Sequence, residues 1–403
     1  MTCFSVSKFL SRRRRGLLAA PLFIAMAALL AVPAMPAQAA VYAASPAQTA
    51  AASAQTSLSA TAFAAASAAS ATVPAPTATA SALPAASPVQ PAAPVVVVLD
   101  PGHGGPEATS DNLGAQYPPY SEQSLTLELA RRIQTELAQY EGITVYLTRS
   151  GNTAATLAQR AALAQSADAD LLVSLHFNAS GSHLFYGSEV WTSAFGDNYA
   201  VGASFGRTAL AQLQGLGFYS RGVKTRIGAR GDYYGVIREA AARNVPAVIV
   251  EHCYLDNETD RALLSVDALA RADAAAIAQY FRLRAKSGAP DYSAYSRPAV
   301  SPAPATGLAQ DVTPPELCRL ELLSVENGLA TLRMTARDSD TAYPVLYYRY
   351  IVNGVSTPLL PYSQSAGSAV FTVPVPAGQT VQVSAAAVNA YELESGSNAV
   401  TVR

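Results

Sequence analysis

Three titratable side chains, two imidazoles and one carboxylate, each stand directly behind a run of apolar residues. They are His103, which follows Val95–Leu99 through an Asp-Pro-Gly turn, His176, which follows Leu171–Leu175, and Glu251, which follows Val245–Val250. Apolar runs of this length are typical of buried strands, and strand ends in an open α/β sheet open onto the ligand crevice. Two imidazoles and a carboxylate that meet there predict a metal ion and a base, and hence hydrolysis.

A second carboxylate, Glu122, lies where a predicted helix begins. Apolar residues recur every fourth position at Leu125, Leu129, Ile133 and Leu137, which predicts the buried face of a helix that starts near Ser121. Extended back by one turn, this face includes Glu122. A carboxylate on a buried face needs a partner, such as a metal ion. A capping acid that interacts with the helix dipole is the alternative interpretation.

Together, His103, Glu122 and His176 offer two nitrogen ligands and one oxygen ligand from three separate elements. This set suits a catalytic zinc ion that keeps an open position for water. Iron in an oxygenase uses the same set, but such sites usually lie in double-stranded β folds, so we predict zinc. Glu251 ends a run of Val and Ile, and burial there would raise the pKa of its carboxyl group into a range useful to a general base.

The surrounding pattern predicts an α/β fold over residues 95–286, with a mixed, mostly parallel sheet flanked by helices. The predicted strands are Val95–Leu99, Ile143–Leu147, Leu171–Leu175, Ser188–Thr192 and Val245–Val250. Besides the helix that begins near Ser121, the predicted helices are Thr153–Ala167, Tyr199–Leu213 and Asp260–Arg284. The mostly βαβ order places these helices on both faces of the sheet.

Residues 311–403 have a different pattern, in which short alternating runs are separated by turns. The runs are Thr331–Thr335, Leu346–Val352, Ala369–Val375 and Val381–Ala387, and the turns contain Asn353-Gly354 and Ala377-Gly378. This predicts a small all-β sandwich of the immunoglobulin or fibronectin III type. The region contains no histidine and no cluster of acids, and we assign no chemistry to it.

Residues 1–39 are predicted to be a signal peptide. Four arginines at 12–15 precede the apolar stretch Leu17–Val32, and Ala37-Gln38-Ala39 supplies a small-residue cleavage site. We therefore expect a secreted protein with no stable membrane anchor after cleavage; an uncleaved anchor is the alternative. Residues 40–94, rich in Ala, Ser and Pro, are predicted to be a disordered linker, and the Pro-rich residues 287–310 a second linker.

The charge of the chain limits its partners. The 403 residues carry a formal net charge of −1 and include no long basic run, which argues against nucleic acid as a partner. We expect a monomer.

Four motifs follow one another over residues 95–286. They are Val98–Gly105 (VLDPGHGG), Glu122 at the start of its helix, Ser174–Ala179 (SLHFNA), and Pro246–Glu251 (PAVIVE) with Asn257 behind it. As an ordered set they resemble the motifs of the zinc-dependent N-acetylmuramoyl-L-alanine amidases. The resemblance implies that His103, Glu122 and His176 bind Zn²⁺ and that Glu251 is the catalytic acid and base.

The resemblance also implies a bacterial enzyme of the cell wall whose partner is peptidoglycan. It would cleave the amide between the lactyl group of N-acetylmuramic acid and the L-alanine of the stem peptide, using a zinc-activated water whose proton Glu251 accepts. Asp100 and Asn178 would orient the ligands, or serve as turn and capping residues. Two alternatives stay open: a zinc peptidase or deacetylase acting on the cell wall, and a non-catalytic wall-binding protein.

Overall fold

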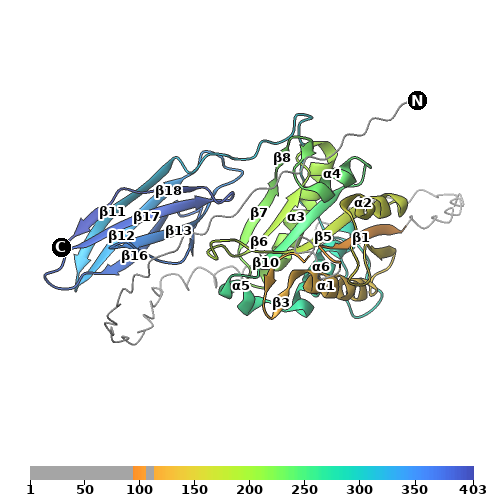
Figure 1. The fold of residues 1–403 in the computed structure, drawn as a ribbon, viewed down its shortest axis with the longest axis horizontal. Coiled ribbons are helices and arrows are strands. Elements are labelled where there is room, and N and C mark those ends of the chain that lie inside the picture. The colour runs from red at the N-terminus through yellow and green to blue at the C-terminus, as the bar shows by residue number, and fades with distance from the viewer. Residues whose placement is uncertain (1–93, 106–112) are drawn as a thin grey trace, which may run out of the picture. The chain divides into compact units, whose positions relative to one another are not determined.

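The computed structural model describes residues 94–105 and 113–403 (Figure 1). The predicted signal peptide and nearly all of the first predicted linker lie outside these residues. A search of the described part of the chain finds no helix that combines the length and the hydropathy needed to cross a membrane.

The amino-terminal half of the described chain is built on a 6-stranded sheet with the order β4-β1-β5-β10-β6-β7. Its strands are β1 (Val95–Pro101), β4 (Ile143–Leu147), β5 (Leu171–Asn178), β6 (Ser188–Thr192), β7 (Ser220–Thr225) and β10 (Ala247–Tyr254). Neighbouring strands are parallel except for β10 and β6, which are antiparallel. The predicted mixed, mostly parallel sheet is therefore confirmed.

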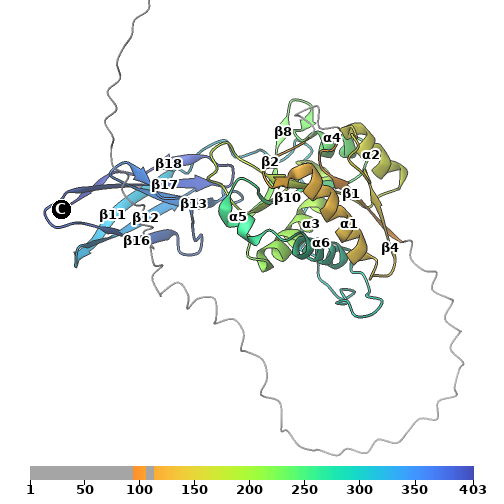
Figure 2. The same cartoon turned by 60° about the horizontal axis from the view of Figure 1, so that its bottom comes forward.

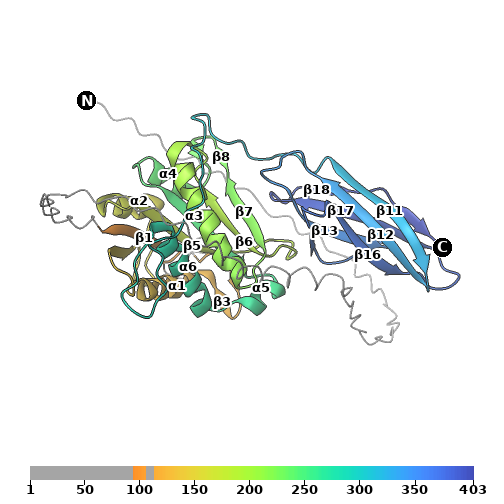
Figure 3. The same ribbon diagram turned by 180° about the vertical axis from the view of Figure 1, so that it is seen from behind.

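Helices cover both faces of this sheet, as the βαβ order predicts (Figure 2, Figure 3). On one face lie α1 (Glu122–Leu137), α3 (Gly196–Gly215) and α6 (Val266–Phe281), and on the other lie α2 (Leu157–Ser166) and α4 (Gly235–Ala241). Successive side chains of each strand point to opposite faces of the sheet, so the sheet separates two apolar cores. Val97 and Leu99 of β1 pack with α1 and α6, whereas Val98 packs with α2 and α4.

Several element boundaries differ from the predicted ones. The helix predicted over Asp260–Arg284 is two helices, α5 (Glu258–Leu263) and α6, because the Ser265 hydroxyl caps a new helix by accepting a hydrogen bond from the Ala268 amide. The helix predicted from Thr153 begins only after Thr156, which forms a capping box with Gln159. The strand predicted over Val245–Val250 begins at Ala247 and continues through Glu251 to Tyr254.

Short elements between the main ones were not predicted. They include β7, α4 and two hairpins, β2 (Gln116–Tyr117) with β3 (Tyr120–Ser121) and β8 (Ile227–Gly228) with β9 (Gly231–Asp232).

The carboxyl-terminal region consists of two antiparallel sheets around one apolar core. One sheet contains β11 (Leu317–Glu326), β12 (Leu329–Arg337) and β16 (Ser368–Pro374). The other contains β13 (Val345–Val352), β14 (Val355–Ser356), β15 (Leu360–Pro361), β17 (Val381–Asn389), β18 (Glu394–Gly396) and β19 (Val400–Val402). Met334 of the first sheet and Val383 of the second are both fully buried in that core, so the fold is the all-β arrangement predicted.

The Pro-rich segment between these regions hydrogen bonds to α3 and the residues before it. The Ser204 hydroxyl donates to the Pro298 carbonyl at 2.6 Å, and the Leu308 amide donates to the Ala194 carbonyl at 3.0 Å.

Candidate active site

The structure brings His103, Glu122 and His176 together at the carboxyl ends of β1 and β5. His103 lies just beyond β1, Glu122 is the first residue of α1, and His176 is near the end of β5. Their ligand atoms all lie within 4.8 Å of one another. Glu122 Oε1 is 3.2 Å from His103 Nε2 and 3.0 Å from His176 Nδ1.

These separations fit a small metal ion with tetrahedral geometry. Zinc binds nitrogen and oxygen at about 2.0–2.1 Å, so neighbouring ligand atoms of a tetrahedron lie roughly 3.3 Å apart. Both distances from Glu122 Oε1 to the histidine nitrogens, 3.0 and 3.2 Å, are close to this length. The residues present therefore fit zinc.

Glu122 is buried and held from both of its oxygens. Its Oε1 accepts a hydrogen bond from the Phe177 amide at 3.0 Å, and its Oε2 accepts one from the Ala115 amide at 2.7 Å. Burial alone would raise the pKa of this carboxyl group, but the hydrogen bonds and charges of His103 and His176 outweigh burial and lower the pKa well below its usual range. The Glu122 carboxylate therefore faces the two histidines rather than the amides of its own first helical turn.

Two buried arginines fix the loop that carries His103. Arg160 donates from Nη2 to the His103 carbonyl at 2.7 Å, and Arg149 donates to the carbonyls of Pro101 and Gly102 at 2.9 and 2.8 Å. His103 itself has a left-handed backbone, with φ of 61°. A non-glycine residue in this region is strained, and the arginine contacts stabilise it there.

Asp100 and Asn178, which were predicted to orient the metal-binding side chains, contact other residues instead. Asp100 Oδ1 accepts from Arg160 Nη1 at 2.6 Å, and Arg160 in turn holds the His103 carbonyl. Asn178 Nδ2 donates to Glu189 at 3.1 Å. Among the described residues, neither side chain hydrogen bonds to His103, His176 or Glu122.

Two glycines leave room for the ligand side chains. A Cβ atom at Gly102 would lie 2.4 Å from the His176 ring, and one at Gly114 would lie 2.3 Å from Glu122 Oε2. Contacts under 3 Å essentially never occur for a real Cβ. The positions of His176 and Glu122 thus depend on the absence of a side chain at both places.

Glu251 lies beside the three metal-site residues. In the register of β10 and β5 it is directly opposite His176. The residue is half-buried, and its Oε2 atom is buried without a hydrogen-bond partner among the described residues. Burial, with the nearby carboxylates of Glu122 and Glu189, raises the pKa of Glu251 well above its ordinary value.

His252 points to the opposite face of β10, as strand alternation predicts. Its Nδ1 lies 2.9 Å from the His176 carbonyl oxygen and its Nε2 lies 2.8 Å from Asp273 Oδ2. Burial alone would lower the pKa of this imidazole, but Asp273 outweighs burial and raises it. Both ring nitrogens are thus occupied within the protein.

Charged residues that no sequence pattern indicates lie next to Glu251. Glu189 is the cross-strand neighbour of Glu251 on β6, and it is buried. Its Oε2 accepts hydrogen bonds from Arg221 at 2.8 Å and Lys224 at 2.6 Å, both on β7. Burial would raise the pKa of Glu189, but these two cations lower it to about 2. Only the pairing of β6 with β10 reveals this neighbour.

A cavity of about 650 Å³ opens beside the metal-site residues on the α2 side of the sheet. It is lined by His103, His176, Arg160, Leu157 of α2 and Val236 of α4. A substrate that reaches the histidines has room there.

Comparison with known proteins identifies this arrangement. Residues 97–280 match the family model described as N-acetylmuramoyl-L-alanine amidase. Through these residues the chain is similar to the N-acetylmuramoyl-L-alanine amidase family. Because members of this family are amide hydrolases, the prediction of an enzyme of this class is confirmed.

Individual amidases resemble the same part of the chain. The sporulation-specific N-acetylmuramoyl-L-alanine amidase of Bacillus subtilis (strain 168) is 29% identical over 48% of this chain and 71% of its own. CwlM, an N-acetylmuramoyl-L-alanine amidase of Bacillus licheniformis, is 29% identical over 48% of this chain and 72% of its own. A solved catalytic domain, that of the amidase CwlV from Bacillus (Paenibacillus) polymyxa var. colistinus, is 29% identical, covers 46% of this chain and 98% of that one, and has a TM-score of 0.39.

Proposed function

We propose that this amidase hydrolyses peptidoglycan at the amide between the lactyl group of N-acetylmuramic acid and the L-alanine of the stem peptide. The family match supports an amide bond in this polymer as the substrate. The observation that carries the chemistry is Glu251, which lies opposite His176 in the sheet and whose Oε2 is buried without a hydrogen-bond partner among the described residues.

In this proposal His103, Glu122 and His176 hold a zinc ion. When bound, zinc acts as a Lewis acid that acidifies water and polarises a carbonyl group. The chain supports the site by presenting Glu122 as a carboxylate and by fixing the backbone of His103 through Arg160. The hydrogen bonds made by Glu122 and by the His103 loop thus position the three proposed ligands before the metal binds.

Glu251 serves as the proton carrier. Its pKa is raised by burial and by two neighbouring carboxylates, the direction that favours a carboxyl group able to take up and return a proton. Its free Oε2 accepts the proton of the attacking water and then returns it to the nitrogen of the departing L-alanine. The carboxyl group thereby converts a poor leaving group, an amide anion, into a neutral amine.

We also propose the setting in which the enzyme works. A relative that is 32% identical over 42% of this chain and 51% of its own length is named a probable cell wall amidase, LytH, of Staphylococcus saprophyticus. That name and the predicted signal peptide over 1–39 support secretion to the bacterial cell envelope. The proposed organisation is a linker at 40–94, a catalytic domain at 95–286, a second linker at 287–310 and a β-sandwich at 311–403, in a monomer without a stable membrane anchor.

Mass spectrometry of digested peptidoglycan tests this function. Purified peptidoglycan is incubated with the mature protein, with and without a zinc chelator. We expect intact stem peptides with a new L-alanine amino terminus, and we expect the chelator to abolish their release. Shortened stems would instead indicate a peptidase, released acetate a deacetylase, and zinc binding without any product a wall-binding protein.

A further inference from the structure

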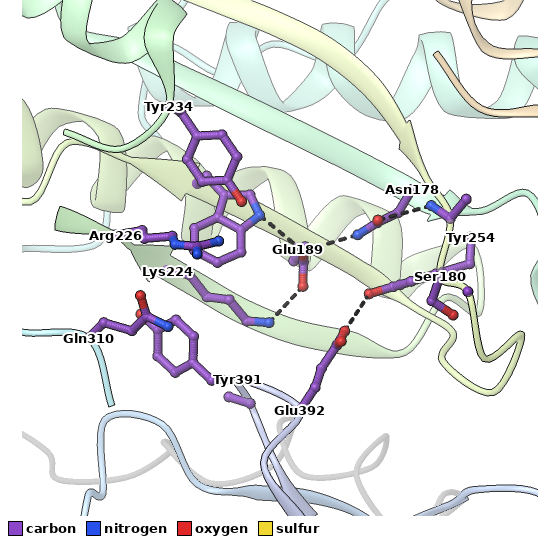
Figure 4. A pocket seen from close by; sticks show the side chains of 14 residues that line it. Asn178, Ser180, Glu189, Lys224, Arg226, Tyr234, Tyr254, Gln310, Tyr391 and Glu392 are labelled. Carbon is purple, nitrogen blue, oxygen red and sulfur yellow. Dashed lines mark hydrogen bonds and ion pairs between the residues drawn. The ribbon is translucent and has the colours of Figure 1, made fainter. Parts of the chain in front are cut away.

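A second cavity, of about 470 Å³, lies on the β6 and β7 side of Glu251 (Figure 4). Asn178, two residues after His176 on β5, lines it, and so does Glu189, the cross-strand neighbour of Glu251. The cavity therefore lies next to the strand positions of His176 and Glu251, although neither of these residues lines it. It is separate from the cavity lined by His103 and His176.

The floor of this second cavity is rigid because Glu189 is fully satisfied. The carboxylate accepts hydrogen bonds from the Trp191 indole at 2.9 Å and the Asn178 amide at 3.1 Å, in addition to those from Arg221 and Lys224. Glu189 is shared by Arg221 and Lys224, so the charges on the floor are used in ion pairs within the protein. The more exposed charged groups lie at the rim.

Residues outside the family match complete the rim. Tyr391 donates from its hydroxyl to the Thr225 carbonyl at 2.6 Å, and its ring lies 6.0 Å from that of Trp191. Glu392 Oε1 accepts from Arg221 at 2.6 Å and from the Tyr254 hydroxyl at 3.0 Å. The carboxyl-terminal β region thus supplies part of a cavity whose floor belongs to residues 97–280.

The rim presents charges of both signs at its two ends, as Figure 4 shows with Arg226 at one end and Glu392 at the other. Arg226 is half-buried and stacks on Tyr233, with its guanidinium carbon 3.7 Å from the ring centre. Among the described residues no carboxylate forms an ion pair with it. The Glu392 side chain keeps 37% of its surface exposed although Oε1 pairs with Arg221.

We propose that this cavity binds the peptide side of the substrate, with a peptide carboxylate on Arg226 and a peptide amino group near Glu392. The inference rests on the proposed function. A guanidinium without a carboxylate partner binds a carboxylate through two parallel, charge-assisted hydrogen bonds. An uncharged glycan carries no carboxylate and cannot form this ion pair. Trp191, Tyr234 and Tyr391 supply flat apolar surface for the chain between the two charged groups.

Isothermal titration with a synthetic tripeptide, L-Ala-γ-D-Glu-L-Lys, tests this assignment without the need for turnover. We expect the mature chain to bind the tripeptide and Arg226→Ala to weaken binding about tenfold, the usual loss for one charge-assisted contact. Arg230→Ala is the matched control, because Arg230 is exposed and does not line the cavity. Equal dissociation constants for Arg226→Ala and the unchanged chain would overturn the proposal.

A second pair of measurements tests the β region. Glu392→Gln keeps an oxygen for Arg221 and Tyr254 but removes the charge. We expect the unchanged chain to bind the tripeptide more tightly than the same tripeptide acetylated on its lysine side chain, and Glu392→Gln to bind both equally. A variant that still prefers the free amine would show that Glu392 does not contact it.

The peptidoglycan digest separates failure of this inference from failure of the proposed function. If the unchanged chain releases stem peptides and Arg226→Ala shows an unchanged affinity and an unchanged KM, only the peptide assignment fails. We expect KM to rise about tenfold in that variant at constant kcat. If the unchanged chain releases no stem peptide, the amidase reaction fails, and the titration still decides what the cavity binds.

Discussion

At the scale of single residues, Glu251 is the proposed proton carrier. Replacing it by Gln keeps the shape and removes the group that accepts a proton. We expect Glu251→Gln to lower kcat by a factor of about a hundred to ten thousand, the usual contribution of a general base. Zinc binding, measured by titration, should persist because the three ligands are unchanged.

Glu128→Gln is the control for this substitution, since Glu128 lies on the exposed side of α1 and pairs with Arg132. It should keep full activity in the same peptidoglycan digest. If Glu251→Gln retained a tenth of the activity or more, Glu251 would not be the base.

Gly102 is a second residue whose role can be isolated. A Cβ atom there would meet the His176 ring at 2.4 Å, so the ring must move away from Glu122. We expect Gly102→Ala to weaken zinc binding by about ten- to a hundredfold, as for other changes that reorient a ligand. Gly151→Ala, at a position with nothing within 4 Å of the added atom, should leave zinc affinity unchanged. Competition with a fluorescent chelator measures both, and equal affinities would disprove the steric role of Gly102.

At the scale of elements, Glu189 joins β6 to β7. Glu189→Gln leaves Arg221 and Lys224 buried without their shared carboxylate, and loss of one partner of a buried ion pair costs about 3–5 kcal/mol. We expect the free energy of unfolding, measured in urea at pH 7, to fall by that amount. Glu321→Gln, which breaks an exposed pair with Arg333 on neighbouring strands, should change it by less than about 1 kcal/mol.

The same residue predicts a pH dependence. The pKa of Glu189 is lowered from 4.5 to about 2 in the folded protein, so its contribution is complete above pH 4.5 and is lost as the pH falls toward 2. The expected loss is about 3 kcal/mol, because one pKa unit corresponds to about 1.4 kcal/mol. In urea titrations over this range, Glu189→Gln should lack this part of the decrease. Parallel curves for the two proteins would contradict it.

The elements also show where sequence patterns are sufficient. Apolar periodicity predicts β1 and α1 because their buried faces are rich in Val, Leu and Ile. Strand β7 was missed because its buried side chains include Arg221 and Lys224, which are stabilised by Glu189 rather than by apolar contacts. In the candidate site, the sequence indicates His103, His176 and Glu251 because each follows an apolar run. The position of Glu189 next to Glu251 results from strand pairing, which no local sequence pattern contains.

At the scale of the whole molecule, the residues proposed to bind zinc come from elements that are distant in the chain. His103 follows β1, Glu122 begins α1 and His176 lies near the end of β5, so only the folded protein assembles the site. Zinc at one hundred times its dissociation constant should therefore raise the free energy of unfolding by about 2.7 kcal/mol. His176→Ala should show no such increase in urea titrations with and without zinc.

His183→Ala is the control, because this imidazole is largely exposed and lies outside the group of three ligands. Its unfolding should respond to zinc as that of the unchanged protein does. A zinc-dependent increase in His176→Ala equal to that of the control would show that the ion binds elsewhere.

The reversed strand β6 has a consequence for how such an enzyme can diversify. Because β6 is antiparallel to β10, its first residues lie at the same sheet edge as the last residues of β5. Residues 179–187 therefore leave and re-enter the sheet at that edge, and Ala179–Gly181 line the second cavity. Insertions or deletions in this connection alter the cavity while the registers of β5 and β6 stay fixed. If this cavity binds the peptide side of the substrate, as proposed, the length of one loop determines which peptides fit, without a change in the three residues proposed to bind zinc.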